Sequence, residues 1–236
     1  MTETKPKRVA LVTGTGPGLG ASLARRFAKD YAVAVNARSE SHLRTLASEI
    51  RDAGGVALEV PGDIGDRAAV SAMFGTIRDR LGAVDVLLYN AGSGNWGTVA
   101  DITPEQFERS WRVNAFGAFL CAAECAHDMI PRGRGVMLFT GATAGVKAGP
   151  KSVAFGPAKF AMRGLSQSLA RDLGPKGIHV AWVNIDGGID IPGRAVGPKE
   201  ALLDPDAIAE AYWHLAHQHR SAWTMETELR PFCEKF

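Results

Sequence analysis

The sequence has few cysteines, no long apolar run and little net charge. Three cysteines without regular spacing are typical of a reducing compartment rather than of a disulfide framework. No apolar stretch approaches the length of a membrane span, and residues 1–6 contain no signal-peptide hydrophobic region. A net charge of +2, without a long run of lysine or arginine, argues against nucleic acid as a partner. We therefore expect a cytoplasmic protein with neither a membrane nor a nucleic acid as partner.

The order of the predicted elements indicates an α/β protein, and 236 residues suit one domain over residues 1–236. Short valine-rich runs alternate with longer amphipathic segments. The expected strands lie at residues 7–12, 31–36, 56–60, 84–89, 135–140, 178–185 and 222–230. The expected helices end near residue 30, span 39–53, 66–81, 103–130 and about 154–174, and begin at 204. Strands joined by such helices pair in parallel through right-handed crossovers. This predicts a Rossmann-like, doubly wound parallel sheet of about seven strands with helices on both faces.

A glycine-rich turn follows the first predicted strand and opens the first predicted helix. Gly14 can adopt the positive φ of a tight turn, and Gly18 lets the backbone approach a diphosphate. Gly20 allows the helix to pack closely on the strand. The free N–H groups at the start of that helix then face the phosphates, which predicts nucleotide binding.

Several short motifs follow one another along the chain. They are Thr13 with the glycines after it, Asp63-Ile64, Asn90-Ala91-Gly92, Val113-Asn114, Lys159, Arg171-Asp172-Leu173-Gly174 and Gly177-Ile178-His179-Val180. In these motifs, and over nearly its whole length, the chain resembles the short-chain dehydrogenase/reductase superfamily. The resemblance implies a nicotinamide cofactor, hydride transfer with a small-molecule substrate, and a homodimer or homotetramer built on the long helices. The expected cofactor contacts are Gly14, Gly18, Leu19, Gly20, Arg38, Asp63, Ile64, Asn90, Ala91, Gly92, Lys159, Gly187 and Ile189.

Two of these positions concern the adenosine half of the cofactor. We expect Asp63 to accept a hydrogen bond from the adenine amino group, the alternative being an ordinary helix-start or turn aspartate. Folds that prefer NAD usually place a carboxylate at the end of the second strand. Here Arg38 stands at that end and can bind a 2′-phosphate, with Ser39 as a further donor. We therefore predict NADP(H) rather than NAD, the alternative being a surface arginine without a ligand.

The catalytic positions depart from the family pattern. Its members typically carry a tyrosine four residues before the helical lysine, whose charge lowers the phenol pKa and so aids proton transfer. Lys159 is present, but Phe155 occupies the tyrosine position and Ala142 the position of the usual serine. The two hydroxyls that contact the substrate in typical members of the family are therefore missing from this chain. We predict Lys159 and Asn114 as the remaining catalytic pair, with Asn114 supporting the site from behind.

Four groups remain as candidates for proton donation, and each has a simpler interpretation. Lys159 could hold the nicotinamide ribose instead, and Thr143 could be the serine equivalent displaced by one residue. Ser152 could cap the following helix. Asp186 could bind backbone N–H groups in its own turn.

A histidine cluster near the carboxyl end raises the question of a metal. On a helix from residue 204, His214 and His217 would share a face, whereas His219 would not. No cysteine or second cluster completes a ligand set, so we expect no metal.

Three functions remain open. The first is an NADP(H)-dependent oxidoreductase with an altered proton relay, acting on a nonpolar carbonyl or enone substrate, given the apolar Phe155 and Ala142. The second is reduction of a conjugated C=C bond, where water can protonate the enolate. The third is a catalytically inactive NADP(H)-binding protein with a regulatory or interaction role.

Overall fold

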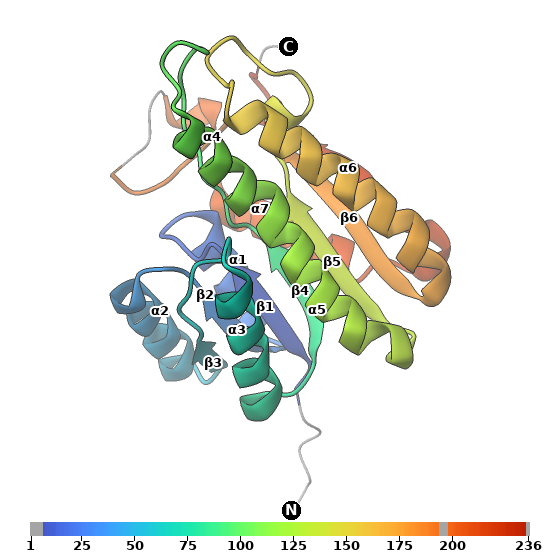
Figure 1. The fold of residues 1–236 in the computed structure, drawn as a ribbon. Helices are drawn as coiled ribbons and strands as arrows, with labels where there is room; N and C mark the ends of the chain where they lie inside the picture. Colours follow the sequence, from blue (N-terminus) through green and yellow to red (C-terminus); the bar gives the residue numbers. More distant parts are fainter. Residues whose placement is uncertain (1–6, 194–197, 235–236) are drawn as a thin grey trace, which may run out of the picture.

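The structure, a computed structural model, describes residues 7–193 and 198–234. One parallel sheet has the strand order β3-β2-β1-β4-β5-β6-β9 (Figure 1). Its strands are β1 (Val9–Thr13), β2 (Ala32–Asn36), β3 (Val56–Glu59), β4 (Val84–Tyr89), β5 (Gly135–Thr140), β6 (Ile178–Ile185) and β9 (Glu226–Leu229). A second small sheet joins β7 (Gly188–Ile189) to β8 (Leu202–Leu203). The strand order reverses between β1 and β4, which is where such sheets bind ligands. The predicted Rossmann-like fold is confirmed.

Helices cover both faces of the sheet. In Figure 1 the near face carries α3 (Arg67–Arg80), α4 (Pro104–Trp111), α5 (Gly117–Arg132) and α6 (Phe155–Leu173). The opposite face carries α1 (Leu19–Ala28), α2 (Glu40–Asp52) and α7 (Pro205–Ala216). Each face buries its own apolar cluster, because a parallel sheet requires cover on both sides. No helix within the two described ranges is long and apolar enough to cross a membrane.

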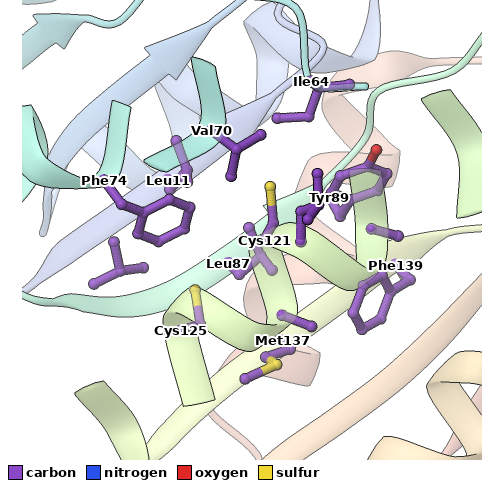
Figure 2. Close-up of a cluster of buried hydrophobic side chains, with 14 of the residues drawn as sticks. Leu11, Ile64, Val70, Phe74, Leu87, Tyr89, Cys121, Cys125, Met137 and Phe139 are labelled. Atoms are coloured by element: carbon purple, nitrogen blue, oxygen red, sulfur yellow. The ribbon is translucent and has the colours of Figure 1, made fainter. Parts of the chain in front are cut away.

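The core beneath α3 and α5 fixes the position of β4, whose end contributes to the site. Figure 2 shows Leu87 and Tyr89 of β4 among side chains from α3, α5 and β5. The Tyr89 hydroxyl donates to the carbonyl of Val113, 2.5 Å away. Cys121 and Cys125 are free and fully buried here, one helical turn apart, and burial raises the pKa of both thiols. They are packing residues.

The helix predicted for residues 103–130 differs from the observed one in two ways. Its start is as expected, because Thr103 and Gln106 form a reciprocal capping box. A π-helical turn at Arg112–Phe116 then separates α4 from α5. The end predicted at residue 130 is wrong, because α5 continues through Pro131 to Arg132. Arg132 bonds to Asp85 and to the Val84 carbonyl, so the last turn is anchored to β4 until Gly133 ends it with φ 61°.

The last strand is shorter than predicted. β9 spans Glu226–Leu229, whereas the prediction began at residue 222. Residues Arg220–Ala222 form a 3₁₀ turn, which His219 caps by accepting from the Ser221 N–H. The pairing of β9 with β6 therefore begins only at Glu226, opposite Trp182.

Candidate functional site

The glycine turn between β1 and α1 has the conformation that its sequence predicts. Gly14 has φ +66°, and a Cβ there would lie 2.4 Å from the Ala91 Cα. A Cβ at Gly20 would lie 2.5 Å from the Gly14 carbonyl oxygen, so Gly20 allows α1 to pack closely on the turn. A Cβ at Gly18 would instead meet the Ile191 side chain at 2.8 Å. Gly18 thus makes room for the segment after β6, a contact that the sequence did not reveal.

A cleft of about 800 Å³ lies along this turn, at the carboxyl ends of the strands. Its lining includes predicted cofactor residues from the ends of β1, β2 and β4 and from the loop after β3, namely Gly14, Arg38, Asp63, Ile64, Ala91 and Gly92. It also includes residues that the sequence did not single out, among them Thr15, His42, Ser93 and Arg109. The cleft therefore brings together groups from distant parts of the chain at the point where the strand order reverses.

Asp63 is held by two contacts at one side of this cleft. Its Oδ1 accepts from the Gly65 N–H at 2.9 Å, and its Oδ2 lies 3.2 Å from Nη2 of Arg109. Burial alone would raise the pKa of Asp63, but the Gly65 hydrogen bond and the charges of Arg109 and Arg38 outweigh it and hold that pKa below its ordinary value. Asp63 is therefore held in its ionised form, with Arg109 as its ion-pair partner.

Asn90 serves the turn itself. Its Nδ2 donates to the Gly14 carbonyl at 3.1 Å, while Thr13 Oγ1 accepts from the Asn90 and Ala91 N–H groups at 3.2 and 3.3 Å. These bonds join the ends of β1 and β4. Asn90 is not among the residues that line the cleft, so its contribution is to fix the glycine turn in place.

Lys159 and Asn114 both approach Gly92. A Cβ on Gly92 would lie 3.5 Å from Asn114 Oδ1 and 4.0 Å from Lys159 Nζ. The Asn114 amide nitrogen donates to the carbonyls of Ser93 and Ser110. Its Oδ1 is buried and has no hydrogen-bond partner within the described residues. The missing side chain of Gly92 leaves space there for a hydroxyl that could donate to this oxygen.

The Lys159 ammonium is buried, with 4% of the residue exposed. Nζ donates to the Thr140 carbonyl at 2.8 Å and lies 5.4 Å from the centre of the Phe155 ring. Burial without a counter-charge lowers the pKa of Lys159 to about 7. The lysine can therefore gain or lose a proton near neutral pH.

Two alternative interpretations of the site residues are wrong. Ser152 does not cap α6, because its Oγ donates to the Gly149 carbonyl at 2.8 Å. Asp186 does not bind the backbone of its own turn. Its Oδ1 accepts from Thr143 Oγ1 at 2.5 Å, and its Oδ2 lies 2.8 Å from Nη2 of Arg230. Thr143 and Asp186 thus join the ends of β5 and β6.

The segment after β6 carries the last predicted cofactor residues. Gly187 has φ +142°, and a Cβ there would lie 2.9 Å from the Pro231 ring. Ile189 pairs with Leu203 in the small sheet. Neither residue lines the cleft of the glycine turn.

The histidines near the carboxyl end contact the protein itself. The ring nitrogens of His217 lie 2.7 Å from the Trp213 carbonyl and 3.1 Å from the Tyr31 hydroxyl. His217 follows the last residue of α7. Over residues 7–193 and 198–234, no group of three or more histidine, cysteine, aspartate or glutamate side chains is placed to hold a metal ion.

A second, mostly apolar cleft of about 610 Å³ lies between the loop after β4 and the loop before α6. Its lining combines Trp96 with residues of the loop between β5 and α6, namely Thr143, Ala144, Lys147, Ala148, Gly149, Pro150, Lys151 and Ser152. The Trp96 and Phe155 rings lie 5.1 Å apart, centre to centre. Trp96 could not be predicted as a site residue, because a single tryptophan in a loop has no periodic pattern.

The fold and the glycine turn together define a dinucleotide-binding type of α/β protein. The short chain dehydrogenase family model matches residues 8–190. The chain therefore belongs to the short-chain dehydrogenase/reductase family and is an oxidoreductase of that type.

Individual relatives agree with this assignment. The chain is 37% identical over 178 residues to short-chain dehydrogenase/reductase eriH of Hericium erinaceus, covering 73% of this chain and 71% of the relative. It is 35% identical over 175 residues to versicolorin reductase stcU of Emericella nidulans, covering 73% and 66%. Among solved structures, a short-chain dehydrogenase from Rhodopseudomonas palustris has a TM-score of 0.85 at 33% identity, covering 97% of this chain and 100% of the other. An actinorhodin polyketide ketoreductase solved with NADPH has a TM-score of 0.89 at 25% identity, covering 99% of each chain.

Proposed function

We propose that this protein is an NADP(H)-dependent oxidoreductase that acts on a nonpolar carbonyl or enone substrate and moves the substrate proton without a catalytic tyrosine. One observation carries the proposal. Lys159, buried beside Gly92 with a pKa of about 7, is an ionisable group, and the resemblance to the family implies that it belongs to the catalytic helix.

The proposed preference for NADP(H) over NAD rests on the residues at the end of β2. Asn36 is buried there, and its Nδ2 donates to the Val60 carbonyl at 2.9 Å, so it serves the fold rather than a ribose hydroxyl. Arg38 and Ser39 are exposed on the cleft lining, next to His42. A guanidinium and a hydroxyl are suited to a 2′-phosphate. Two structural relatives, the actinorhodin ketoreductase and a metagenomic short-chain oxidoreductase, were solved with NADPH and NADP.

We place the nicotinamide ribose beside Gly92, because Asn114 and Lys159 both approach that residue. Asn114 Oδ1 needs a donor, and Lys159 Nζ can donate, so one hydroxyl could bond to both groups. When bound, NADPH supplies the hydride. Lys159 then holds the proton at Nζ and gives it to the substrate oxygen, directly or through that hydroxyl. For alcohol oxidation the neutral amine accepts the proton instead.

Reduction of a conjugated C=C bond is the second candidate. Phe155 and Ala142 leave no hydroxyl at the two positions that normally contact a substrate oxygen. Hydride transfer to carbon produces an enolate that water can protonate, so this reaction depends least on those hydroxyls. The walls of the second cleft are largely apolar, which suits either substrate.

A homo-oligomer is part of the proposal. Trp111, Phe116 and Phe119 form a ladder of stacked rings where α4 passes into α5, with ring centres 5.5 and 6.5 Å apart. Trp111 and Phe119 are 43% and 50% exposed. Aromatic residues that are exposed together on one helical face are typical of a protein interface. We propose that this face pairs two copies of the chain.

Turnover tests the function. Purified protein is mixed with NADPH and a panel of aromatic ketones and enones, and NADPH loss is followed by absorbance. We expect turnover that Lys159→Ala lowers at least 100-fold, a typical cost of losing a positioned acid. Lys176→Ala, which alters an exposed lysine distant from both clefts in sequence, is the control. Tight NADPH binding without hydride transfer to any compound would favour the catalytically inactive alternative.

A further inference from the structure

His42 differs from other polar side chains that line the cleft along the glycine turn. Thr15 Oγ1 donates to the Val12 carbonyl at 3.0 Å, and Asn36 Nδ2 donates to the Val60 carbonyl at 2.9 Å, so both are engaged within the fold. His42 also lines the cleft, but its Nε2 is buried without a hydrogen-bond partner, and Nδ1 has none either, within the described residues. Polar groups of a folded protein are normally satisfied, so this ring is a candidate for contact with a ligand.

His42 lies where α2 begins, close in sequence to the end of β2. Ser39 is the N-cap of α2 and Glu40 its first residue, so His42 is the third helical residue. A side chain at the third position can reach back toward the N-cap. The Ser39 hydroxyl makes no capping bond and lies 3.2 Å from Ser41 Oγ. Arg38, Ser39 and His42 therefore line the cleft together, on the side where the 2′-phosphate of NADP(H) is proposed to bind.

The surroundings of the His42 ring assign its proton. A neutral imidazole carries one N–H donor and one bare nitrogen that accepts. A buried N–H without a partner is rarer in proteins than an unfilled acceptor, so the buried Nε2 is the bare nitrogen. Nδ1 is then the donor. It is also the ring nitrogen that a ligand in the cleft can reach, because Nε2 is enclosed by the protein.

A 2′-phosphate can use a donor beyond Arg38 and Ser39, because it has three strong acceptor oxygens. The positive charge of Arg38 is shared with Asp63, whose pKa it helps to lower. Glu40 adds a carboxylate in the first turn of α2. A hydrogen bond from Nδ1 to a charged oxygen is strong at short range, so it adds affinity that these nearby carboxylates do not cancel.

We propose that His42 is a specificity-determining residue for the cofactor and donates from Nδ1 to the 2′-phosphate of NADP(H). This rests on the proposed function and adds to Arg38 a second group that distinguishes the phosphate from the 2′-hydroxyl of NAD(H). Both groups hold one phosphate, so the loss of either weakens the contribution of the other. The uncharged hydroxyl of NADH accepts a weaker bond, and His42 then contributes little.

Two nucleotides isolate this contact. Adenosine 2′,5′-bisphosphate and adenosine 5′-monophosphate differ only in the 2′-phosphate, and calorimetry on the full chain measures the dissociation constant of each. We expect His42→Leu to weaken binding of the bisphosphate about tenfold and that of the monophosphate less than about twofold. His42→Asn, whose amide N–H lies near the place of Nδ1, should keep the affinity for the bisphosphate within about threefold. His127→Leu, which alters an exposed histidine on α5, is the control and should change neither.

The outcomes separate this proposal from the one on which it rests. Unchanged binding of the bisphosphate in His42→Leu would overturn the role of His42 and leave the preference for NADP(H) intact. An equal loss for both nucleotides in His42→Leu, or a loss in His42→Asn as large as in His42→Leu, would show that His42 only supports the shape of α2. Equal affinity of the unaltered chain for the two nucleotides would overturn both proposals.

Discussion

Thr143 Oγ1 lies 2.5 Å from Oδ1 of Asp186, and this bond joins the ends of β5 and β6 directly beneath the site. Asp186 is 3% exposed and also pairs with Arg230, so one carboxylate oxygen accepts a hydrogen bond and the other has an ion-pair partner. A buried carboxylate is tolerated only when it is paired in this way. The bond therefore belongs to the framework that holds the two strand ends.

Replacement of Thr143 by valine tests this framework role. The change removes a donor to a buried carboxylate at nearly constant volume, and we expect a loss of about 1 to 2 kcal/mol in the free energy of unfolding. Urea unfolding measures it. NADPH affinity should change less than twofold, because Thr143 does not line the cofactor cleft. A tenfold loss of NADPH affinity at unchanged stability would show that Thr143 acts at the cofactor instead.

The pH dependence of stability should reveal the buried Lys159. Its pKa is near 7 in the folded protein and 10.5 as the ordinary value. Between these values the unfolded chain binds a proton that the folded chain does not, so stability should rise with pH from about 7 to about 10.5. Below pH 7 the full cost of burying the charge is present. Lys159→Met should remove this rise in urea unfolding followed at several pH values, and an identical rise in the variant would contradict the assignment.

The rate of carbonyl reduction should depend on the same ionisation of Lys159, but it should fall with pH where the stability rises. A proton donor must be protonated, so carbonyl reduction should fall as pH rises through about 7, whereas alcohol oxidation should increase. Steady-state rates over pH 5.5 to 9, in one buffer series, measure both directions. A reduction rate that is flat over this range would exclude Lys159 as the donor.

Restoring the missing hydroxyls should restore ordinary carbonyl reduction. Phe155 lies one helical turn before Lys159, and its ring centre is 5.4 Å from Nζ. Phe155→Tyr combined with Ala142→Ser should therefore raise the rate on simple ketones by about 10² or more. Ala142→Ser alone serves as the matched control and should give little gain. No increase in the double variant, with NADPH affinity intact, would mean that the loops around the site also prevent the reaction.

The ring ladder on α4 and α5 predicts the subunit contact. Trp111→Glu places a charge on the exposed face and should convert a dimer or larger oligomer to monomer, as measured by light scattering on a sizing column. Met225→Glu, which alters a residue of comparable exposure outside these helices, should leave the assembly unchanged. A mass that is the same for Trp111→Glu and the unaltered protein would place the contact elsewhere.

Local patterns in the sequence predicted the helices and strands well, but they did not predict contacts between distant segments of the chain. The positive φ of Gly14 and the cap at Thr103 are local features, so they could be inferred from neighbouring residues, whereas the close approach of Gly14 to Ala91 could not. Arg109 approaches Asp63 only because α4 packs beside the loop after β3, and one arginine on a polar helix carries no mark of that contact. The end of α5 was missed because Arg132 is anchored to β4, which outweighs the usual effect of Pro131.

The central claim is that the cleft along the glycine turn holds NADP(H), with Arg38 binding the 2′-phosphate. Fluorescence titration of the protein and of Arg38→Ala with NADPH and NADH tests it, with Arg44→Ala as a control. We predict NADPH binding at least tenfold tighter than NADH, lost in Arg38→Ala through weaker NADPH binding alone. Equal affinities for the two cofactors, or a preference unchanged in Arg38→Ala, would contradict the account.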